Sequence, residues 1–261
     1  MFRLGGKLVI GVVHLLPLPG SPAYGGNRQA IRTAARRDAT AYLEGGCHGI
    51  IVENHGDGPF FKNDVGPAVV AEMTHAAAAV VSLLDDRHCL GINVLRNDAS
   101  AALSIAAAVG AHFIRVNVHT GSMYTDQGLI EGRAAETLRL RRALETDVAI
   151  FADIAVKHAI PPAGFDRARA ARDCVGRGGA DGLIVTGAAT GAPTSEGEIL
   201  EVKSAAPKHP ILVGSGVTAA TVGPLLGIAD GVIVGTSLKE GGDVHNPVDA
   251  KRVAEFVRNA T

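Results

Sequence analysis

ILVGSGVTAATVGPLLGIADGVIVGTSLKEGG, residues 211–242, holds two short apolar runs that bracket one helical pattern. Ile211–Val213 and Gly231–Val234 each have the composition of a buried strand, and each ends in a turn of small residues. The stretch therefore predicts two strand-to-helix units in succession, as in a parallel α/β protein. The turns are Gly214-Ser215-Gly216 and Gly235-Thr236-Ser237.

These two turns have the chemistry of a phosphate cradle. Glycine lacks a Cβ atom, so backbone N–H groups can approach an anion, and a following helix start adds unpaired N–H groups and a positive dipole end. In a (β/α)8 barrel the ends of the seventh and eighth strands commonly form such a site. The alternative is a pair of tight turns without a ligand. Because the turns follow successive strands, we expect them to bind a small phosphorylated ligand.

The rest of the chain repeats the same unit. With 261 residues, of which 47% are apolar, the chain is long enough for one barrel. Near-continuous apolar strands alternating with helices favour an α/β fold, a (β/α)8 TIM barrel in a single domain over residues 1–261, rather than an open doubly wound sheet. Strands are predicted to begin near Leu8, Gly49, Leu90, His112, Val148, Gly182, Ile211 and Gly231, and the clearest helical patterns are Arg28 to Glu44, Pro67 to Leu84, Ala99 to Val109, Arg133 to Leu144 and Asp166 to Arg177.

Three helix-to-strand turns resemble one another, at residues 46–52, 179–185 and 228–234. Each places a polar residue and a glycine just before a predicted strand. Turns of this kind lie at the face of a barrel opposite the active site, so we interpret them as features of stability.

Charge, cysteine content and hydropathy exclude several classes of protein. The 25 Lys and Arg residues balance 26 Asp and Glu residues, so no basic field is available for nucleic acid or an anionic membrane. Three cysteines without C-x-x-C spacing indicate reduced thiols in a cytoplasmic protein. A basic start before Leu8–Val13 resembles a signal peptide, but His14 and Pro17 interrupt the apolar run. No run reaches the roughly 20 apolar residues of a spanning helix, so we expect no transmembrane segment.

Polar residues gather where the predicted strands end, which is the active-site face of a barrel. Asp153 interrupts an apolar run, and a buried carboxylate there must be paired, hydrogen-bonded or bound to a metal. It is a candidate general base, a ligand of a divalent cation, or a partner of Arg115 in a structural ion pair. The full set is His14, Glu53, Asn54, Asn93, Arg115, Asn117, His119, Asp153, Lys157, His158 and Thr186.

Several residues of this set, together with His55, are candidates for proton transfer or covalent chemistry. Glu53 is the second acid/base candidate, on the far side of the barrel from Asp153. Lys157 suggests a Schiff base, but four residues of extended strand span about 13 Å, so a salt bridge to substrate or simple solvation is as plausible. His14 and His119 can shuttle a proton near neutral pH, as can His55 and His158, although most of the ten histidines must be bystanders.

The spacing of the potential metal ligands excludes a zinc motif, so we predict no protein-only metal site. An Mg²⁺ or Mn²⁺ ion held by Glu53, Asp153 and a phosphate group remains open as a cofactor. Two connections are long enough to be functional loops, Glu53 to Asp64 and His119 to Gly132, and the second is a candidate lid.

These strand-end segments resemble the BtpA family over nearly the whole chain. The segments are HLLPLPGSP (14–22), GIIVENHGDGPF (49–60), LGINVLRNDASAAL (90–103), FIRVNVHTG (113–121), TDQGLIEG (125–132), DIAVKHAIP (153–161), GSGVT (214–218) and DGVIVGTSLK (230–239). The resemblance implies a TIM barrel related to phosphate-binding barrels. It also implies the family's label, biogenesis or stabilisation of photosystem I, and an SgcQ-like branch of the family carries a nucleosidase label.

Two hypotheses follow from the residues and the resemblance. The first is a cytoplasmic enzyme, a lyase, isomerase or nucleosidase, acting on a phosphosugar or nucleotide, with Glu53 or Asp153 moving a proton. The second is a non-catalytic assembly factor that acts through protein contacts. Under either hypothesis the Ala-rich helices can supply a homo-oligomer interface.

Overall fold

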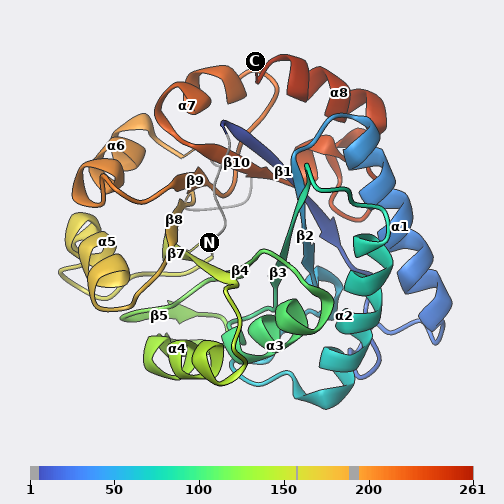
Figure 1. Ribbon diagram of the computed structural model, residues 1–261, viewed down its shortest axis with the longest axis horizontal. Helices are drawn as coiled ribbons and strands as arrows, with labels where there is room; N and C mark the ends of the chain where they lie inside the picture. The colour runs from blue at the N-terminus through green and yellow to red at the C-terminus, as the bar shows by residue number, and fades with distance from the viewer. Residues whose placement is uncertain (1–5, 157, 188–193, 261) are drawn as a thin grey trace.

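Eight parallel strands close into a barrel, and a ring of helices surrounds it (Figure 1). The computed structural model describes residues 6–156, 158–187 and 194–260. Neighbouring strands pair in the order β1-β10-β9-β8-β7-β4-β3-β2, so β1 closes the barrel against both β2 and β10. The predicted TIM barrel is confirmed. Its strands are β1 (Leu8–His14), β2 (Gly49–Glu53), β3 (Cys89–Asn93), β4 (Phe113–Val116), β7 (Ala149–Ala155), β8 (Gly182–Val185), β9 (Ile211–Val213) and β10 (Gly231–Val234).

The helices follow one another around the outside of the barrel, and α8 packs beside α1 (Figure 1). Side-chain caps fix several of their starts: Asn27 accepts a hydrogen bond from the Ala30 N–H, and Ser195 and Glu198 form a capping box. No helix among the described residues is long and apolar enough to cross a membrane. The helices are α1 (Arg28–Glu44), α2 (Gly66–Val81), α3 (Ala99–Val109), α4 (Ala134–Ala143), α5 (Arg167–Gly176), α6 (Glu196–Ala205), α7 (Val222–Ile228) and α8 (Ala250–Arg258).

The barrel interior is a compact apolar core, separate from the larger core between strands and helices. Because side chains of a strand alternate between its two faces, every second residue points inward. Two glycines make room for the largest interior side chains: a Cβ atom at Gly91 would lie 2.3 Å from the Phe113 ring, and one at Gly182 would lie 2.3 Å from the Phe151 ring. The interior residues are Ile10, Val12, Ile51, Cys89, Phe113, Ala149, Phe151, Ile184, Leu212 and Ile233.

The repeated turns before the strands are structural, as predicted. The Nδ1 atom of His48 accepts a hydrogen bond from the Val9 N–H at 3.1 Å. The carboxylates of Asp181 and Asp230 accept from the N–H groups of Ile150 and Ile211 at 2.8 and 2.9 Å. Each polar residue therefore satisfies the N–H of a neighbouring strand near the start of that strand.

Two connections differ from the expected irregular loops. The segment from His119 to Gly132 contains an antiparallel hairpin, β5 (Ser122–Thr125) paired with β6 (Gly128–Glu131), and Tyr124 also pairs with Ile160. The connection after β2 contains a single 3-10 turn, His55–Asp57. Strand β1 extends one residue beyond the predicted Val13 and includes His14.

Candidate functional site

A ring of residues lies directly above the apolar interior, one residue from each of the eight strands. Each follows an inward-facing position by two residues, so all eight point to the axis at the carboxyl end of the barrel. Six strands contribute a polar side chain, and β9 and β10 contribute glycine. We call this set the polar ring: His14, Glu53, Asn93, Arg115, Asp153, Thr186, Gly214 and Gly235.

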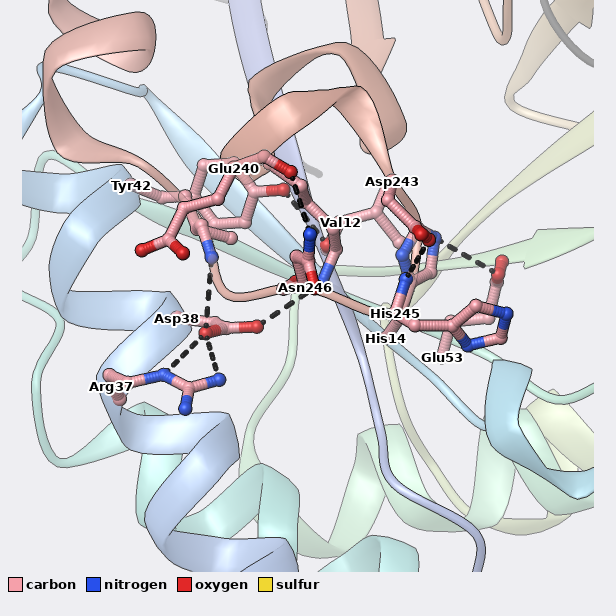
Figure 2. A network of polar contacts seen from close by, with 12 residues as sticks. Val12, His14, Arg37, Asp38, Tyr42, Glu53, Glu240, Asp243, His245 and Asn246 are labelled. Carbon is pink, nitrogen blue, oxygen red and sulfur yellow. Dashed lines mark hydrogen bonds and ion pairs between the residues drawn. The ribbon is translucent and has the colours of Figure 1, made fainter.

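One side of the polar ring carries a carboxylate between an imidazole and an amide. His14, Glu53, Asn93 and Arg115 are in register on neighbouring strands β1 to β4. Asn93 donates a hydrogen bond from Nδ2 to Glu53 Oε2 at 2.6 Å, and His14 Nε2 lies 3.7 Å from Glu53 Oε1. Figure 2 shows the His14 ring facing Glu53. Glu53 is buried, so this carboxylate is held in place yet borders the pocket described below.

Asp153 occupies the opposite part of the ring and is fully paired. Its carboxylate accepts hydrogen bonds from Arg115 Nε and Nη2, both at 3.0 Å, from Asn117 Nδ2 at 2.9 Å and from Thr186 Oγ1 at 2.6 Å. Burial lowers the pKa of Arg115, but the charge and hydrogen bonds of Asp153 outweigh burial and raise that pKa overall. Through these bonds the Asp153 carboxylate holds the side chains of Arg115 and Asn117 in position.

Above the ring opens a pocket of about 420 Å³ that both glycine turns line. The ring glycines are required by their neighbours: a Cβ atom at Gly214 would lie 2.8 Å from Thr186 Oγ1, and one at Gly235 would lie 2.7 Å from His14 Cε1. The hydroxyl oxygen of Ser215 is buried and has no hydrogen-bond partner among the described residues. A buried hydroxyl without a partner indicates a place for a polar ligand atom.

The second glycine turn, Gly235–Ser237, is hydrogen-bonded to the residue that follows the first, Gly214–Gly216. Ser237 Oγ donates a hydrogen bond to the Val217 carbonyl at 2.9 Å. After Gly235 the chain forms a 3-10 turn, Thr236–Leu238, whose first N–H groups precede its first internal hydrogen bond. The expected helix start at the first turn is absent, because α7 begins only at Val222. The N-terminus of α7 is therefore separated from the first turn by several residues, and an anion at the turns would contact their backbone rather than the start of that helix.

A buried ion pair between Lys239 and Asp38 anchors the segment that follows the second turn. Figure 2 shows Asp38 on α1 and Asn246 near it. Lys239 Nζ lies 3.3 Å from Asp38 Oδ2 on α1 and donates to the Asn246 carbonyl at 2.9 Å. Burial lowers the pKa of Lys239, partly offset by Asp38. Because Gly242 and Val244 line the pocket, this ion pair also fixes one wall of the pocket.

The remaining predicted residues lie elsewhere. His119 does not line the pocket; it is buried and its Nε2 is 2.8 Å from the Gly178 carbonyl, and burial lowers its pKa. Asp153 and Thr186 lie in the ring beneath the pocket rather than on its lining. Lys157 falls outside the described residues. His55 and His158 do line the pocket, and the rings of His14 and His55 are 4.6 Å apart.

Arg96 is a charged residue of the pocket that was not predicted from the sequence. It lies three residues after the end of β3, lines the pocket and is only 8% exposed. Its position just beyond the carboxyl end of a strand was the available signal, but an arginine in a loop is usually exposed.

No group of three His, Cys, Asp or Glu side chains in the described part of the chain is arranged to hold a metal ion. Asp153 already accepts four hydrogen bonds, so it is poorly placed to bind an ion together with Glu53. All three cysteines are free and buried, and burial raises the pKa of each thiol to about 12.

Comparison with known proteins agrees with this architecture. A protein of Synechocystis sp. named photosystem I biogenesis protein BtpA is 50% identical over 249 residues, which cover 95% of this chain and 86% of that protein. An uncharacterized protein of Pyrococcus furiosus is 48% identical over 97% of this chain and 94% of its own length. Phosphoribosyl anthranilate isomerase from Thermus thermophilus shares the fold, with a TM-score of 0.57, 9% identity, and coverage of 97% of this chain and 98% of that chain. The model of the BtpA family matches residues 6–261, and this chain belongs to the BtpA family.

Proposed function

We propose that the protein is an enzyme acting on a small phosphorylated metabolite such as a phosphosugar or nucleotide. The observation that carries the proposal is the uneven composition of the polar ring, which has polar side chains on one side and two glycine turns on the other. Six strands supply polar side chains, and the two glycine turns that follow β9 and β10 line the same pocket. Such a site can fix a phosphate group while side chains across the ring act on the remainder of the ligand.

Proton transfer is assigned to Glu53 with His14. Asn93 holds one carboxylate oxygen of Glu53, while the other faces His14 and borders the pocket. In this arrangement Glu53 accepts a proton from the substrate and His14 supplies or removes one near neutral pH. A lyase, an isomerase and a nucleosidase all need such a transfer close to a bound phosphosugar.

A divalent cation is compatible with this site only through Glu53 and the ligand. Asp153, the second carboxylate considered, is occupied by Arg115, Asn117 and Thr186. An Mg²⁺ or Mn²⁺ ion would therefore bind Glu53 and phosphate oxygens, so the ion is expected to stabilise the protein only when the phosphorylated ligand is present.

Thermal unfolding with phosphosugars, nucleotides and inorganic phosphate, each with and without Mg²⁺, Mn²⁺ or EDTA, tests the proposal. A ligand at 100 times its dissociation constant adds about 2.7 kcal/mol, which raises the melting temperature by about 5–10 °C. Ser215→Asp places a negative charge in the first turn and should abolish the shift, whereas Ser215→Ala, which removes only the hydroxyl, should reduce it. Glu53→Gln should keep the shift and lose turnover of the identified substrate. Full turnover by Glu53→Gln would refute the assigned role.

The second candidate is a non-catalytic assembly factor, favoured by the name of the Synechocystis relative. Large apolar side chains are also exposed in loops and the hairpin next to strand ends, including Phe61 at 62% and Ile160 at 71%. This candidate predicts a stable complex or a homo-oligomer, which the substitutions Phe61→Ser and Ile160→Ser should weaken. It also predicts that phosphate ligands leave the melting temperature unchanged. Size-exclusion chromatography with light scattering measures the assembly, and a melting temperature that no phosphate ligand changes distinguishes this candidate from the enzyme.

A further inference from the structure

We propose that the ligand of this pocket carries a second anionic group, a carboxylate with a neighbouring hydroxyl, which Arg96 and Asn117 bind across the barrel mouth from the glycine turns. The inference rests on the proposed phosphate binding and names the substrate class of that site. It concerns residues that the proposed proton transfer does not use.

Strand order places the two subsites on opposite sides of the pocket. Around the closed barrel, β3 stands opposite β9, and β4 stands opposite β10. Arg96 follows β3 and Asn117 follows β4, while the glycine turns follow β9 and β10. Both side chains line the same pocket as the turns. A ligand that reaches both sides must therefore carry a group suited to Arg96 at the end remote from its phosphate.

The backbone around Arg96 is fixed before any ligand binds. Asn54, which is 1% exposed, accepts from the Leu95 N–H at 2.7 Å and donates to the Leu95 carbonyl at 3.3 Å. The Arg96 N–H donates to the Phe61 carbonyl at 3.2 Å. Asn97 forms the matching pair of bonds with the backbone of Val118, at 2.8 and 2.9 Å. Preorganisation of this kind is typical of a binding residue rather than of a solvated loop arginine.

Charge and hydrogen-bond capacity identify the group that fits. A planar guanidinium matches a carboxylate through two parallel hydrogen bonds. Burial lowers the pKa of Arg96, and Asp153, Asp126 and Glu53 only partly offset this effect, so an anion would stabilise its charge. Asn117 is 4% exposed, and its Oδ1 has no hydrogen-bond partner among the described residues because its Nδ2 faces Asp153. A ligand hydroxyl beside the carboxylate supplies the missing donor.

Three-carbon probes test the inference by isothermal titration at constant ionic strength. Wild type should bind 3-phosphoglycerate about 10- to 100-fold more tightly than glycerol 3-phosphate, because one charge-assisted pair is gained. It should bind 3-phosphooxypropanoate, which lacks the hydroxyl, less tightly than 3-phosphoglycerate. Arg96→Met should remove the carboxylate preference, so that 3-phosphoglycerate and glycerol 3-phosphate bind with equal affinity, and Arg96→Lys should keep part of the preference.

Arg133→Met is the control for general electrostatic attraction, because Arg133 pairs with Asp64 and Glu136 outside the pocket. It should retain the full preference. Equal affinity of wild type for 3-phosphoglycerate and glycerol 3-phosphate, or an Arg96→Met variant that keeps the preference, overturns this inference while leaving phosphate binding intact. Absence of binding by all the phosphate probes overturns the proposed phosphate site as well.

Discussion

Replacing Asp153 with asparagine should mainly destabilise the fold, because the carboxylate is the buried counter-charge of Arg115. The Asp153 side chain has no exposed area, and Arg115 is 9% exposed. Removing one partner of a buried ion pair leaves the other charge uncompensated and costs about 3–5 kcal/mol. For a chain of this size that loss lowers the melting temperature by about 6–20 °C. The lost free energy of unfolding comes mainly from the uncompensated charge of Arg115, because the asparagine Oδ1 can still accept a hydrogen bond from Thr186 or Asn117.

Urea unfolding of a double-mutant cycle measures this effect. Arg115→Met alone should cost a similar amount, because it strands the carboxylate, and the double variant should cost clearly less than the sum of the two. Arg133→Met breaks exposed ion pairs and should cost under about 1 kcal/mol. If Asp153→Asn unfolds within about 1 kcal/mol of wild type, or if the two substitutions are additive, Asp153 is not the counter-charge of Arg115 and its assignment as an orienting residue is wrong.

Further predictions concern the structural turns, the barrel interior and the thiols. Burial lowers the pKa of His48 and His112 below the usual 6.5. The stability that the two neutral side chains contribute should therefore be complete above pH 6.5 and lost as the pH falls through the folded-state pKa. The difference between the melting temperatures at about pH 7.5 and about pH 5 should be smaller in the double variant His48→Asn, His112→Asn than in wild type. Gly91→Ala should cost about 1–3 kcal/mol, because its Cβ atom would collide with Phe113, whereas Gly197→Ala in α6 meets no atom and should stabilise slightly, as chemical unfolding would show. The three cysteine thiols, with pKa values of about 12, should not react with a thiol reagent in the native protein, and rapid labelling would show that they are exposed by opening of the fold.

The barrel could be predicted from the sequence because its signals are local. Apolar runs and the small residues that end them mark every strand, and the predicted starts agree with the structure to within one residue. Helices Arg28–Glu44 and Ala99–Val109 match the prediction at both ends. The hairpin between β4 and α4 was missed, because its two strands of four residues are short and its pattern is interrupted by glycine and polar residues.

The composition of the polar ring was also predictable, but the interactions within it were not. Sequence order shows that Asp153 and Arg115 end successive barrel strands, and it left a base, a metal ligand and an ion pair as equal alternatives. The four hydrogen bonds that the Asp153 carboxylate accepts, two of them from Arg115, could not be inferred from the sequence. His119 was a reasonable candidate by position, yet its side chain turns to Gly178 and away from the pocket. Which way a strand-end side chain turns depends on packing by distant segments.

The glycines of the polar ring have a second consequence beyond access to the backbone. Gly235 lets His14 lie against the second turn, and Gly214 lets Arg115 approach the first, since a Cβ atom at Gly214 would lie 3.3 Å from Arg115 Nη2. Each glycine turn is therefore packed directly against one of the two polar clusters, Glu53 with His14 or Arg115 with Asp153. A phosphate group that orders the turns would restrain both clusters at once. Under this arrangement, binding of the phosphate and alignment of the proton-transfer group are one event, and a ligand without phosphate should lose turnover as well as affinity.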